Sequence, residues 1–193
     1  MREYDLIADW YRRDRTQSIG VAESLAAVAS LPRGSRVLDL GCGNGSPISE
    51  ALAGARYRVV GLDSSAGMLA RFRRNLPRIP VVRGDCRVCP FSDALFDAAI
   101  SWGMLFHLTP RDQSIAFASV ARILKPGAPF LFTAAEIPDI AADDPGITGT
   151  LNGVTFRYFA VRDYRTLIAP HGFEIEKVYG DPGIATYYFA RRR

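Results

Sequence analysis

The sequence predicts an α/β fold: a doubly wound, mostly parallel seven-stranded sheet with a C-terminal antiparallel hairpin. Three observations favour it. Strand and helix patterns alternate as far as residue 134, which is typical of a parallel sheet with helices on both faces. A glycine-rich turn at 41–45 joins the first strand to a helix. The last two strand patterns follow one another across a short turn, 180–183, and must therefore pair antiparallel.

The strands are short apolar runs bounded by turn residues. They are predicted at 36–40, 57–62, 81–83, 97–101, 130–134, 173–178 and 186–190. The segment 137–158 contains turn residues at 143–146 and 152–153. We expect this segment to be a long irregular stretch, and long loops in compact domains are usually lids or binding loops.

The helices are segments with a helical apolar period. They are predicted at 4–16, 18–30, 47–54, 66–75, 112–124 and 162–169. Ser46 followed by Pro47 predicts a capped start for the third helix. The segment Pro170-His171-Gly172 predicts the end of the last helix, with His171 at the surface.

Size and composition indicate one domain. The chain has 193 residues, of which 48% are hydrophobic, enough to build a single core. The apolar runs are short and interrupted by charge, and residues 1–4 lack an apolar signal segment, so we expect a cytoplasmic protein without a membrane span. The presence of only three cysteines argues against a disulfide framework.

The net charge of +4 comes almost entirely from arginine, because Lys125 and Lys177 are the only lysines. Arginine favours bidentate contact with phosphate or carboxylate groups, so an acidic partner has to be considered. The arginines are dispersed, however, and no aromatic platform accompanies the few pairs. We therefore expect a solvated basic surface and no nucleic-acid partner.

The segment 37–45, V-L-D-L-G-C-G-N-G, is a strand followed by a turn that can hold a ligand. Alternate glycines let the backbone approach a ligand closely, and the next helix directs free N–H groups into the same space. A dinucleotide fingerprint would need glycine where Ser46 or Ile48 stands, so NAD is disfavoured. No Gly-Lys-Ser/Thr closes the turn, which excludes a phosphate-binding P-loop.

Asp63 ends the second predicted strand, where α/β sheets place a carboxylate that accepts hydrogen bonds from a ribose diol. We therefore predict that Asp63 binds ribose. The alternative is that Asp63 caps the helix predicted at 66–75, a role that Ser64 or Ser65 could fill instead.

The D-L-G-C-G-N-G segment at 39–45 resembles the first motif of class I S-adenosylmethionine-dependent methyltransferases. Segments 84–86, 96–102 and 124–132 resemble the family's third, fourth and fifth strands with their flanks. The start at 4–11 is similar to the Y-D-x-x-A-x-x-Y openings of many small-molecule (type 11-like) methyltransferases. The resemblance is close over residues 34–136 and looser beyond them.

This resemblance implies the Rossmann-like methyltransferase fold with S-adenosyl-L-methionine as cofactor. It implies a single domain, 1–193, in which 1–31 form an N-terminal helical cap and 135–160 a substrate lid. Asp85 is expected to accept a hydrogen bond from the adenine amino group. The expected cofactor-binding residues are Asp39, Leu40, Gly41, Cys42, Gly43, Gly45, Asp63, Ser64, Met68, Asp85, Cys86, Ser101 and Trp102. The expected substrate residues are Tyr4, Trp10, Tyr11, Phe106 and Tyr158.

Methyl transfer asks little of side chains, because the sulfonium is already a strong methyl donor. A general base is needed only if the acceptor atom carries a proton. His107 and Glu136 follow the fourth and fifth strands and are the candidates. The alternative for His107 is a structural histidine that bonds the following turn or packs under the cofactor.

Cys86 and Cys89 form a C-x-x-C pair that could suggest redox or metal chemistry. Pro90 follows directly, and a structural zinc site would need a second pair of ligands. We therefore expect no metal and interpret both thiols as packing residues.

The sequence thus predicts a methyltransferase for a small-molecule acceptor, monomeric or homodimeric, with the methylated atom (O, N or C) left open. Two alternatives remain. One is a non-catalytic S-adenosylmethionine-binding or regulatory protein, which would lack an acceptor cavity. The other is a nucleic-acid methyltransferase, which would need a continuous basic strip beside the pocket.

Overall fold

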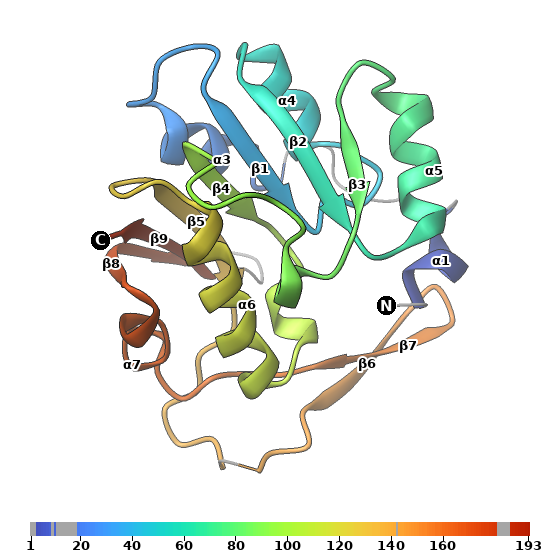
Figure 1. Cartoon of the computed structure of the whole chain (residues 1–193). Helices are drawn as coiled ribbons and strands as arrows, with labels where there is room; N and C mark the ends of the chain where they lie inside the picture. Colours follow the sequence, from blue (N-terminus) through green and yellow to red (C-terminus); the bar gives the residue numbers. More distant parts are fainter. Residues whose placement is uncertain (1–2, 9, 11–18, 142, 181–185) are drawn as a thin grey trace.

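The computed structural model describes residues 3–8, 10, 19–141, 143–180 and 186–193. Seven strands form one sheet in the order β3-β2-β1-β4-β5-β9-β8 (Figure 1). The first five are parallel, and β9 pairs antiparallel with both β5 and β8, which confirms the predicted fold class. The strands are β1 (Arg36–Leu40), β2 (Arg58–Asp63), β3 (Val81–Arg83), β4 (Ala98–Ser101), β5 (Pro129–Ala134), β8 (Phe173–Gly180) and β9 (Thr186–Arg192).

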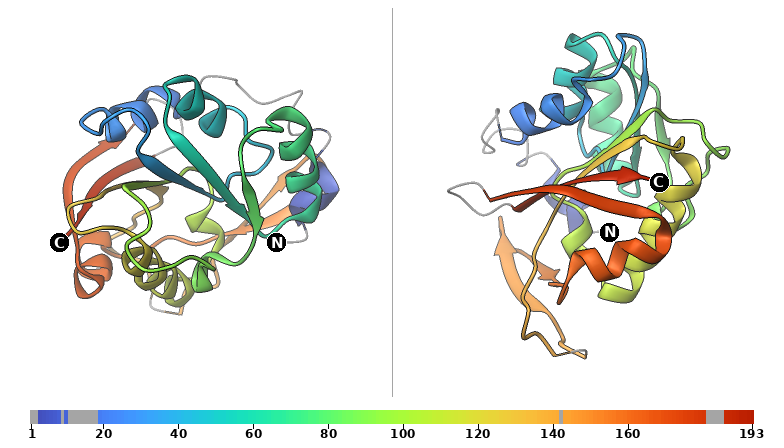
Figure 2. Two further views of the ribbon diagram at one scale, coloured as in Figure 1. Left: turned by 45° about the horizontal axis from the view of Figure 1, so that its top comes forward. Right: turned by 90° about the vertical axis from the view of Figure 1, so that its left-hand side faces the viewer.

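Helices cover both faces of this sheet (Figure 2). One face carries α3 (Val21–Val28), α4 (Ile48–Gly54) and α5 (Ala66–Asn75). The other face carries α6 (Pro110–Ile123) and α7 (Tyr164–Ile168). The short helix α1 (Glu3–Ile7) contacts α5, and three 3₁₀ turns complete the described helices: η1 (Cys86–Val88), η2 (Leu105–His107) and η3 (Ala169–His171).

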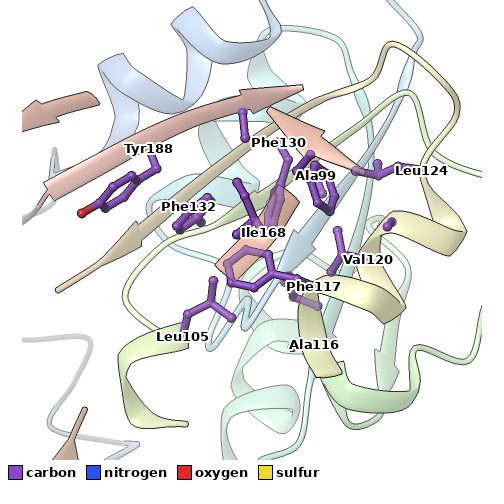
Figure 3. Close-up of a cluster of buried hydrophobic side chains, with 14 of the residues drawn as sticks. Ala99, Leu105, Ala116, Phe117, Val120, Leu124, Phe130, Phe132, Ile168 and Tyr188 are labelled. Atoms are coloured by element: carbon purple, nitrogen blue, oxygen red, sulfur yellow. The ribbon is translucent and has the colours of Figure 1, made fainter. Parts of the chain in front are cut away.

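An aromatic cluster fills the core between the sheet and α6 (Figure 3). The Phe132 and Tyr188 rings are stacked, with centroids 4.9 Å apart and planes at 7°. Phe117 meets Phe132 edge to face at 5.0 Å. Such pairs each add about 0.5–1.5 kcal/mol beyond the apolar area they bury. This cluster fixes α6 against β4 and β5, whose carboxyl ends support the candidate site.

The segment predicted as irregular, 137–158, contains a β-hairpin, so that prediction is wrong. Strand β6 (Ile147–Leu151) pairs antiparallel with β7 (Val154–Tyr158). The connecting residues Asn152 and Gly153 have φ values of 47° and 74°, as a two-residue type I′ turn requires. The hairpin lies apart from the main sheet, and β7 contacts α1 (Figure 1).

The observed helix boundaries differ most from the predicted ones where a capping residue sets the start of the helix. Pro47 takes the cap position of α4, so the prediction that Ser46 caps it is wrong; the Ser46 hydroxyl instead donates to Glu50 at 3.1 Å. Helix α6 starts at Pro110, two residues before the predicted start, because the Thr109 hydroxyl caps it. Helix α1 ends at Ile7, and most of the predicted helix 4–16 lies outside the described residues.

The described helices include none that is long and apolar enough to span a membrane.

Candidate functional site

The loop after β1 opens on a cavity of about 220 Å³ at the carboxyl ends of β1, β2 and β4. Gly41 and Gly43 line it and have φ values of 78° and 53°, a region that favours glycine. A Cβ on Gly41 would lie 2.7 Å from Met104, whereas a Cβ on Gly43 would meet nothing within 4 Å. The backbone at Gly43 therefore borders open space, as expected for a loop that holds a ligand.

Asp63, at the end of β2, lies in the cavity wall beside this loop. Its two carboxylate oxygens accept hydrogen bonds from the backbone nitrogens of Gly43, at 2.9 Å, and of Ser65, at 2.8 Å. Burial raises the pKa of this carboxyl group. Ser65 is the residue that caps α5, by accepting from Met68. A carboxylate offers about four acceptor positions, so Asp63 retains capacity for a ligand.

Asp39 joins the same wall to the helix behind it. It is buried and accepts a hydrogen bond of 2.6 Å from the hydroxyl of Ser49 in α4. This bond fixes the acid that precedes the glycine loop against the helix that follows the loop. The hydrogen bond between Ser49 and Asp39 thus holds both ends of the turn in place.

Asp85, after β3, lines the cavity but is held by Arg87. The backbone nitrogen and guanidinium of Arg87 donate to both carboxylate oxygens, at 2.6–3.1 Å. These hydrogen bonds lower the pKa of Asp85. Arg87 also pairs with Asp112 at 3.2 Å. An adenine amino group would therefore share the Asp85 carboxylate with this guanidinium, a contact that the sequence does not predict.

Trp102 borders the cavity at the end of β4, where its indole nitrogen donates to the Tyr187 hydroxyl at 3.2 Å. This bond ties the ring to β9, a strand distant in sequence.

The structure gathers most of the predicted site residues around one cavity. The predicted residues that line it are Tyr4, Asp39, Gly41, Cys42, Gly43, Asp63, Ser64, Met68, Asp85, Cys86 and Trp102. Three predicted cofactor residues do not line it. Leu40 belongs to the hydrophobic core, and Ser101 is buried within β4. Gly45 faces α5 instead, where a Cβ would lie 2.6 Å from Leu76.

Sequence reasoning missed several residues of the cavity wall. They are Ser46, Pro47, Ile48, Leu62, Gly84, Arg87 and Leu108. Most of them directly adjoin predicted positions, so a wider window at each strand end would have included them. Arg87 and Leu108 come from turns whose direction the sequence does not define.

His107 lies behind the cavity wall, in an aromatic cluster. Its Nε2 atom is 2.9 Å from the Tyr4 hydroxyl, and its Nδ1 atom is 3.1 Å from the Arg157 carbonyl oxygen. Its ring lies 4.9 Å from that of Tyr158 and 4.8 Å from that of Phe106, between centroids. Burial lowers the pKa of His107, so the ring is neutral at neutral pH. The cavity is reached from this cluster through Tyr4, since His107, Phe106 and Tyr158 do not line it.

The second candidate base, Glu136, is exposed and accepts a hydrogen bond of 2.8 Å from the backbone nitrogen of Tyr164. It therefore lies at the start of α7 and does not line the cavity. Trp10 is partly exposed and does not line the cavity either, whereas Tyr11 lies outside the described residues.

The thiols of Cys86 and Cys89 are free, and Cys89 is buried. Burial raises the pKa of Cys86 to about 12 and also raises that of Cys89, so both are protonated at neutral pH. The backbone nitrogen of Cys89 donates to Ser119 at 2.9 Å, which ties η1 to α6. Within the described part of the chain, no group of three or more His, Cys, Asp or Glu side chains could hold a metal ion.

Comparisons with known proteins agree with this geometry. Residues 37–127 match a family model described as a methyltransferase domain. A probable S-adenosylmethionine-dependent methyltransferase of Mycolicibacterium smegmatis is 29% identical over 171 residues, 89% of this chain and 62% of that protein. A fatty-acid O-methyltransferase of the same organism is 37% identical over 122 residues, 62% of this chain and 43% of that protein. The chain thus spans less than two thirds of either relative.

Among solved structures, the amino pentose methyltransferase CalS10 of Micromonospora echinaspora, with S-adenosylmethionine bound, superposes with a TM-score of 0.75. It is 22% identical, over 96% of this chain and 95% of that chain, so this likeness concerns the fold. Fold, loop motif and family match together support a class I S-adenosylmethionine-dependent methyltransferase domain. S-adenosylmethionine is the cofactor of this domain.

Proposed function

We propose that the protein transfers a methyl group from S-adenosylmethionine to a small-molecule acceptor. The observation that carries the proposal is the half-buried Asp63 carboxylate bonded to the glycine loop at the edge of an open cavity. A ribose diol donates two hydrogen bonds, and charge-assisted bonds of this kind are about twice as strong as neutral ones.

The residues of the cavity fit this cofactor. Gly41 and Gly43 provide a backbone that a ligand can approach closely, and Asp63 provides acceptors for the ribose. We assign Asp85 and Cys86, which line the cavity, to the adenine, and Asp39, which also lines it, to the amino-acid end. When bound, the cofactor supplies an activated methyl group. The protein needs only to align the acceptor with it and to exclude water.

We assign the acceptor side to α1 and the β6–β7 hairpin, which lie below the carboxyl ends of β1 and β2 in Figure 1. Tyr4 of α1 lines the cavity, and its ring packs on the buried Phe156 of β7, at 4.9 Å between centroids. Residues 1–31 would then act as an N-terminal cap and 135–160 as a lid on a single domain. Opening of α1 and the hairpin together would admit the acceptor.

Relatives support a small-molecule acceptor without selecting one. The names of matched proteins include a fatty-acid O-methyltransferase and a demethylmenaquinone methyltransferase. The scattered ion pairs found among the described residues, such as Arg122 with Asp93 and Arg191 with Glu176, neutralise part of the basic surface. A nucleic-acid acceptor would need that surface unpaired and continuous.

Two measurements test the proposal. Isothermal calorimetry should show binding of S-adenosylhomocysteine and none of NAD. Incubation with S-adenosylmethionine and a panel of hydroxyl, amine, carboxylate and thiol acceptors should form S-adenosylhomocysteine above the acceptor-free rate. Failure to bind S-adenosylhomocysteine would overturn the proposal. Binding without turnover across the panel would favour the non-catalytic alternative.

A further inference from the structure

Tyr4 and His107 form a hydrogen-bonded pair that links the cavity to the aromatic cluster behind it. The phenol oxygen of Tyr4 lies 2.9 Å from His107 Nε2, although 103 positions separate the two residues. Tyr4 lines the cavity and His107 does not. Among the described residues, the Tyr4 phenol therefore connects the histidine to the cavity wall by a hydrogen bond.

The direction of this hydrogen bond follows from the other side of the imidazole ring. His107 Nδ1 lies 3.1 Å from the Arg157 carbonyl oxygen, which can only accept. Nδ1 therefore carries the hydrogen. A neutral imidazole has one N–H, so Nε2 accepts, and the hydrogen between the two residues belongs to the Tyr4 hydroxyl.

A phenol whose hydrogen is donated to histidine faces its other neighbours as an acceptor. We propose that Tyr4 accepts the proton of the methyl acceptor and passes its own proton to His107, so that Tyr4 is the catalytic residue and His107 the positioning residue. This inference rests on the proposed function and adds a catalytic group and an acceptor class to it.

The proton transfers balance the reaction. As the acceptor atom bonds to the methyl carbon, the C–S bond breaks and its electron pair stays on sulfur. The acceptor's proton moves to the Tyr4 oxygen, and the phenolic proton moves to His107 Nε2. The positive charge lost from sulfur thereby appears on the imidazolium. After product release, the imidazolium returns its proton to Tyr4, and Tyr4 releases one to water.

The surroundings suit a charge that is formed only briefly. Burial disfavours imidazolium and lowers the pKa of His107, while the Arg157 carbonyl and the Glu3 carboxylate act in the opposite sense. Tyr158 of β7 also packs on the ring, and burial raises its pKa, so it stays neutral. The imidazole is therefore a neutral proton acceptor at neutral pH.

The pair also restricts the acceptor. A phenol oxygen carries lone pairs that accept hydrogen bonds, and Tyr4 lines the cavity, so Tyr4 favours a nucleophile that brings a hydrogen, a hydroxyl or an N–H group. An ionised carboxylate brings none and would face those lone pairs. The structure thus points to a hydroxyl or amine acceptor, in contrast to the carboxylate implied by the name of the fatty-acid relative.

The first test needs no acceptor. The chain has two histidines, so ¹⁵N NMR of the imidazole rings gives two sets of signals. We expect His107 to be neutral with the hydrogen on Nδ1, and Tyr4→Phe to shift its Nε2 signal while His171 stays unchanged. An Nε2–H ring, or a His107 signal that Tyr4→Phe leaves in place, overturns the inference.

The second test is kinetic and uses the acceptor that the panel identifies. Tyr4→Phe keeps the ring, and His107→Gln keeps an oxygen that accepts from Tyr4 but takes no proton. Each should lower kcat about 10²-fold or more, and the double variant should be no slower, because the two groups act as a unit. Tyr179→Phe, exposed on β8, and His171→Gln are the matched controls and should retain turnover.

A merely structural role is excluded by comparing acceptors. With a nitrophenol that is already ionised at the assay pH, the loss in Tyr4→Phe should shrink, whereas a misplaced lid would slow both acceptor types equally. Affinity for S-adenosylhomocysteine should be unchanged in both variants. If the wild type does not bind S-adenosylhomocysteine, the proposed function is wrong. If both variants bind it normally but Tyr4→Phe slows turnover equally with protonated and ionised acceptors, only the proposed role of Tyr4 is wrong.

Discussion

Asp63 Oδ2 lies 2.9 Å from the backbone nitrogen of Gly43, so the acid that ends β2 is bonded to the glycine loop that follows β1. The same carboxylate accepts from Ser65 at the start of α5. One side chain therefore joins the two turns between which we place the cofactor.

Replacement of Asp63 by alanine should weaken binding of S-adenosylhomocysteine about 10- to 150-fold, because hydrogen bonds to a charged group contribute about 1.5–3 kcal/mol. Calorimetry measures the change. Asp93→Ala removes an exposed carboxylate that pairs with Arg122 and is the matched control. An affinity for S-adenosylhomocysteine that is the same in Asp63→Ala and Asp93→Ala would remove Asp63 from the site.

Binding of S-adenosylhomocysteine should weaken as the pH falls through the pKa of Asp63, which burial raises above 3.8. Affinity falls with falling pH because the ribose hydroxyls donate to the charged carboxylate, and a proton bound to the carboxylate competes with them. The onset should come at a higher pH than the ordinary aspartate value. Calorimetry over a pH series would check this, and Asp63→Ala should lose the dependence.

Gly43→Ala and Gly34→Ala separate backbone strain from ligand space. Both glycines have positive φ and open space around the added Cβ, so each variant should lose about 1 kcal/mol of folding stability. Only the methyl group of Gly43→Ala enters the cavity. It alone should lower affinity for S-adenosylhomocysteine, as measured by calorimetry beside thermal unfolding. Equal affinities in the two variants would argue that the loop does not touch the ligand.

Asp5 fastens α1 to α5, since its carboxylate accepts from the Ser65 hydroxyl at 2.5 Å and from the Gly67 nitrogen at 2.7 Å. Asp5→Asn should lower the melting temperature by about 2–4 °C, the effect of about 1 kcal/mol in a domain of this size. The hydrogen bond from Ser65 lowers the pKa of Asp5 below 3.8. Its contribution is therefore present above pH 3.8 and is lost as the pH falls through the lowered value. The melting curves of wild type and variant should converge there.

Replacement of Cys86 by alanine and Cys89 by valine should leave folding and binding of S-adenosylhomocysteine largely intact. Both thiols are protonated at neutral pH, and Cys89 is packed against α6. Elemental analysis of the wild type should find no bound zinc. Stoichiometric zinc in the purified protein, or its loss in the double variant, would contradict the packing role.

Strand periodicity and the antiparallel ending were sufficient to predict the main sheet, because every strand of it except β3 contains buried core residues, and the two valines of β3 are partly buried against the core. The β6–β7 hairpin was missed because β6 is largely exposed and carries no apolar alternation. Its signal was the pair Asn152-Gly153, whose backbone conformation suits a two-residue hairpin. The fold of that segment is thus determined by turn chemistry more than by hydrophobic burial.

The candidate site divides in a similar way. Positions at strand ends, such as Asp63 and Trp102, follow from the rule that ligands lie beyond the carboxyl ends of parallel strands. The hydrogen bonds between Arg87 and Asp85 and between Tyr4 and His107 depend on side-chain direction and on packing between distant segments. Neither leaves a pattern in a single sequence.

The position of β9 has a consequence for synthesis of the protein. It is the last strand of the sheet in sequence but lies between β5 and β8. During translation, β5 and β8 leave the ribosome before β9, and these two strands do not pair with each other. The sheet can close only when residues 186–192 have emerged, so a nascent chain exposes an unpaired edge of β5 until then. If translation stalls before β9 has emerged, the nascent chain should therefore expose the edge of β5, and chaperones should recognise it.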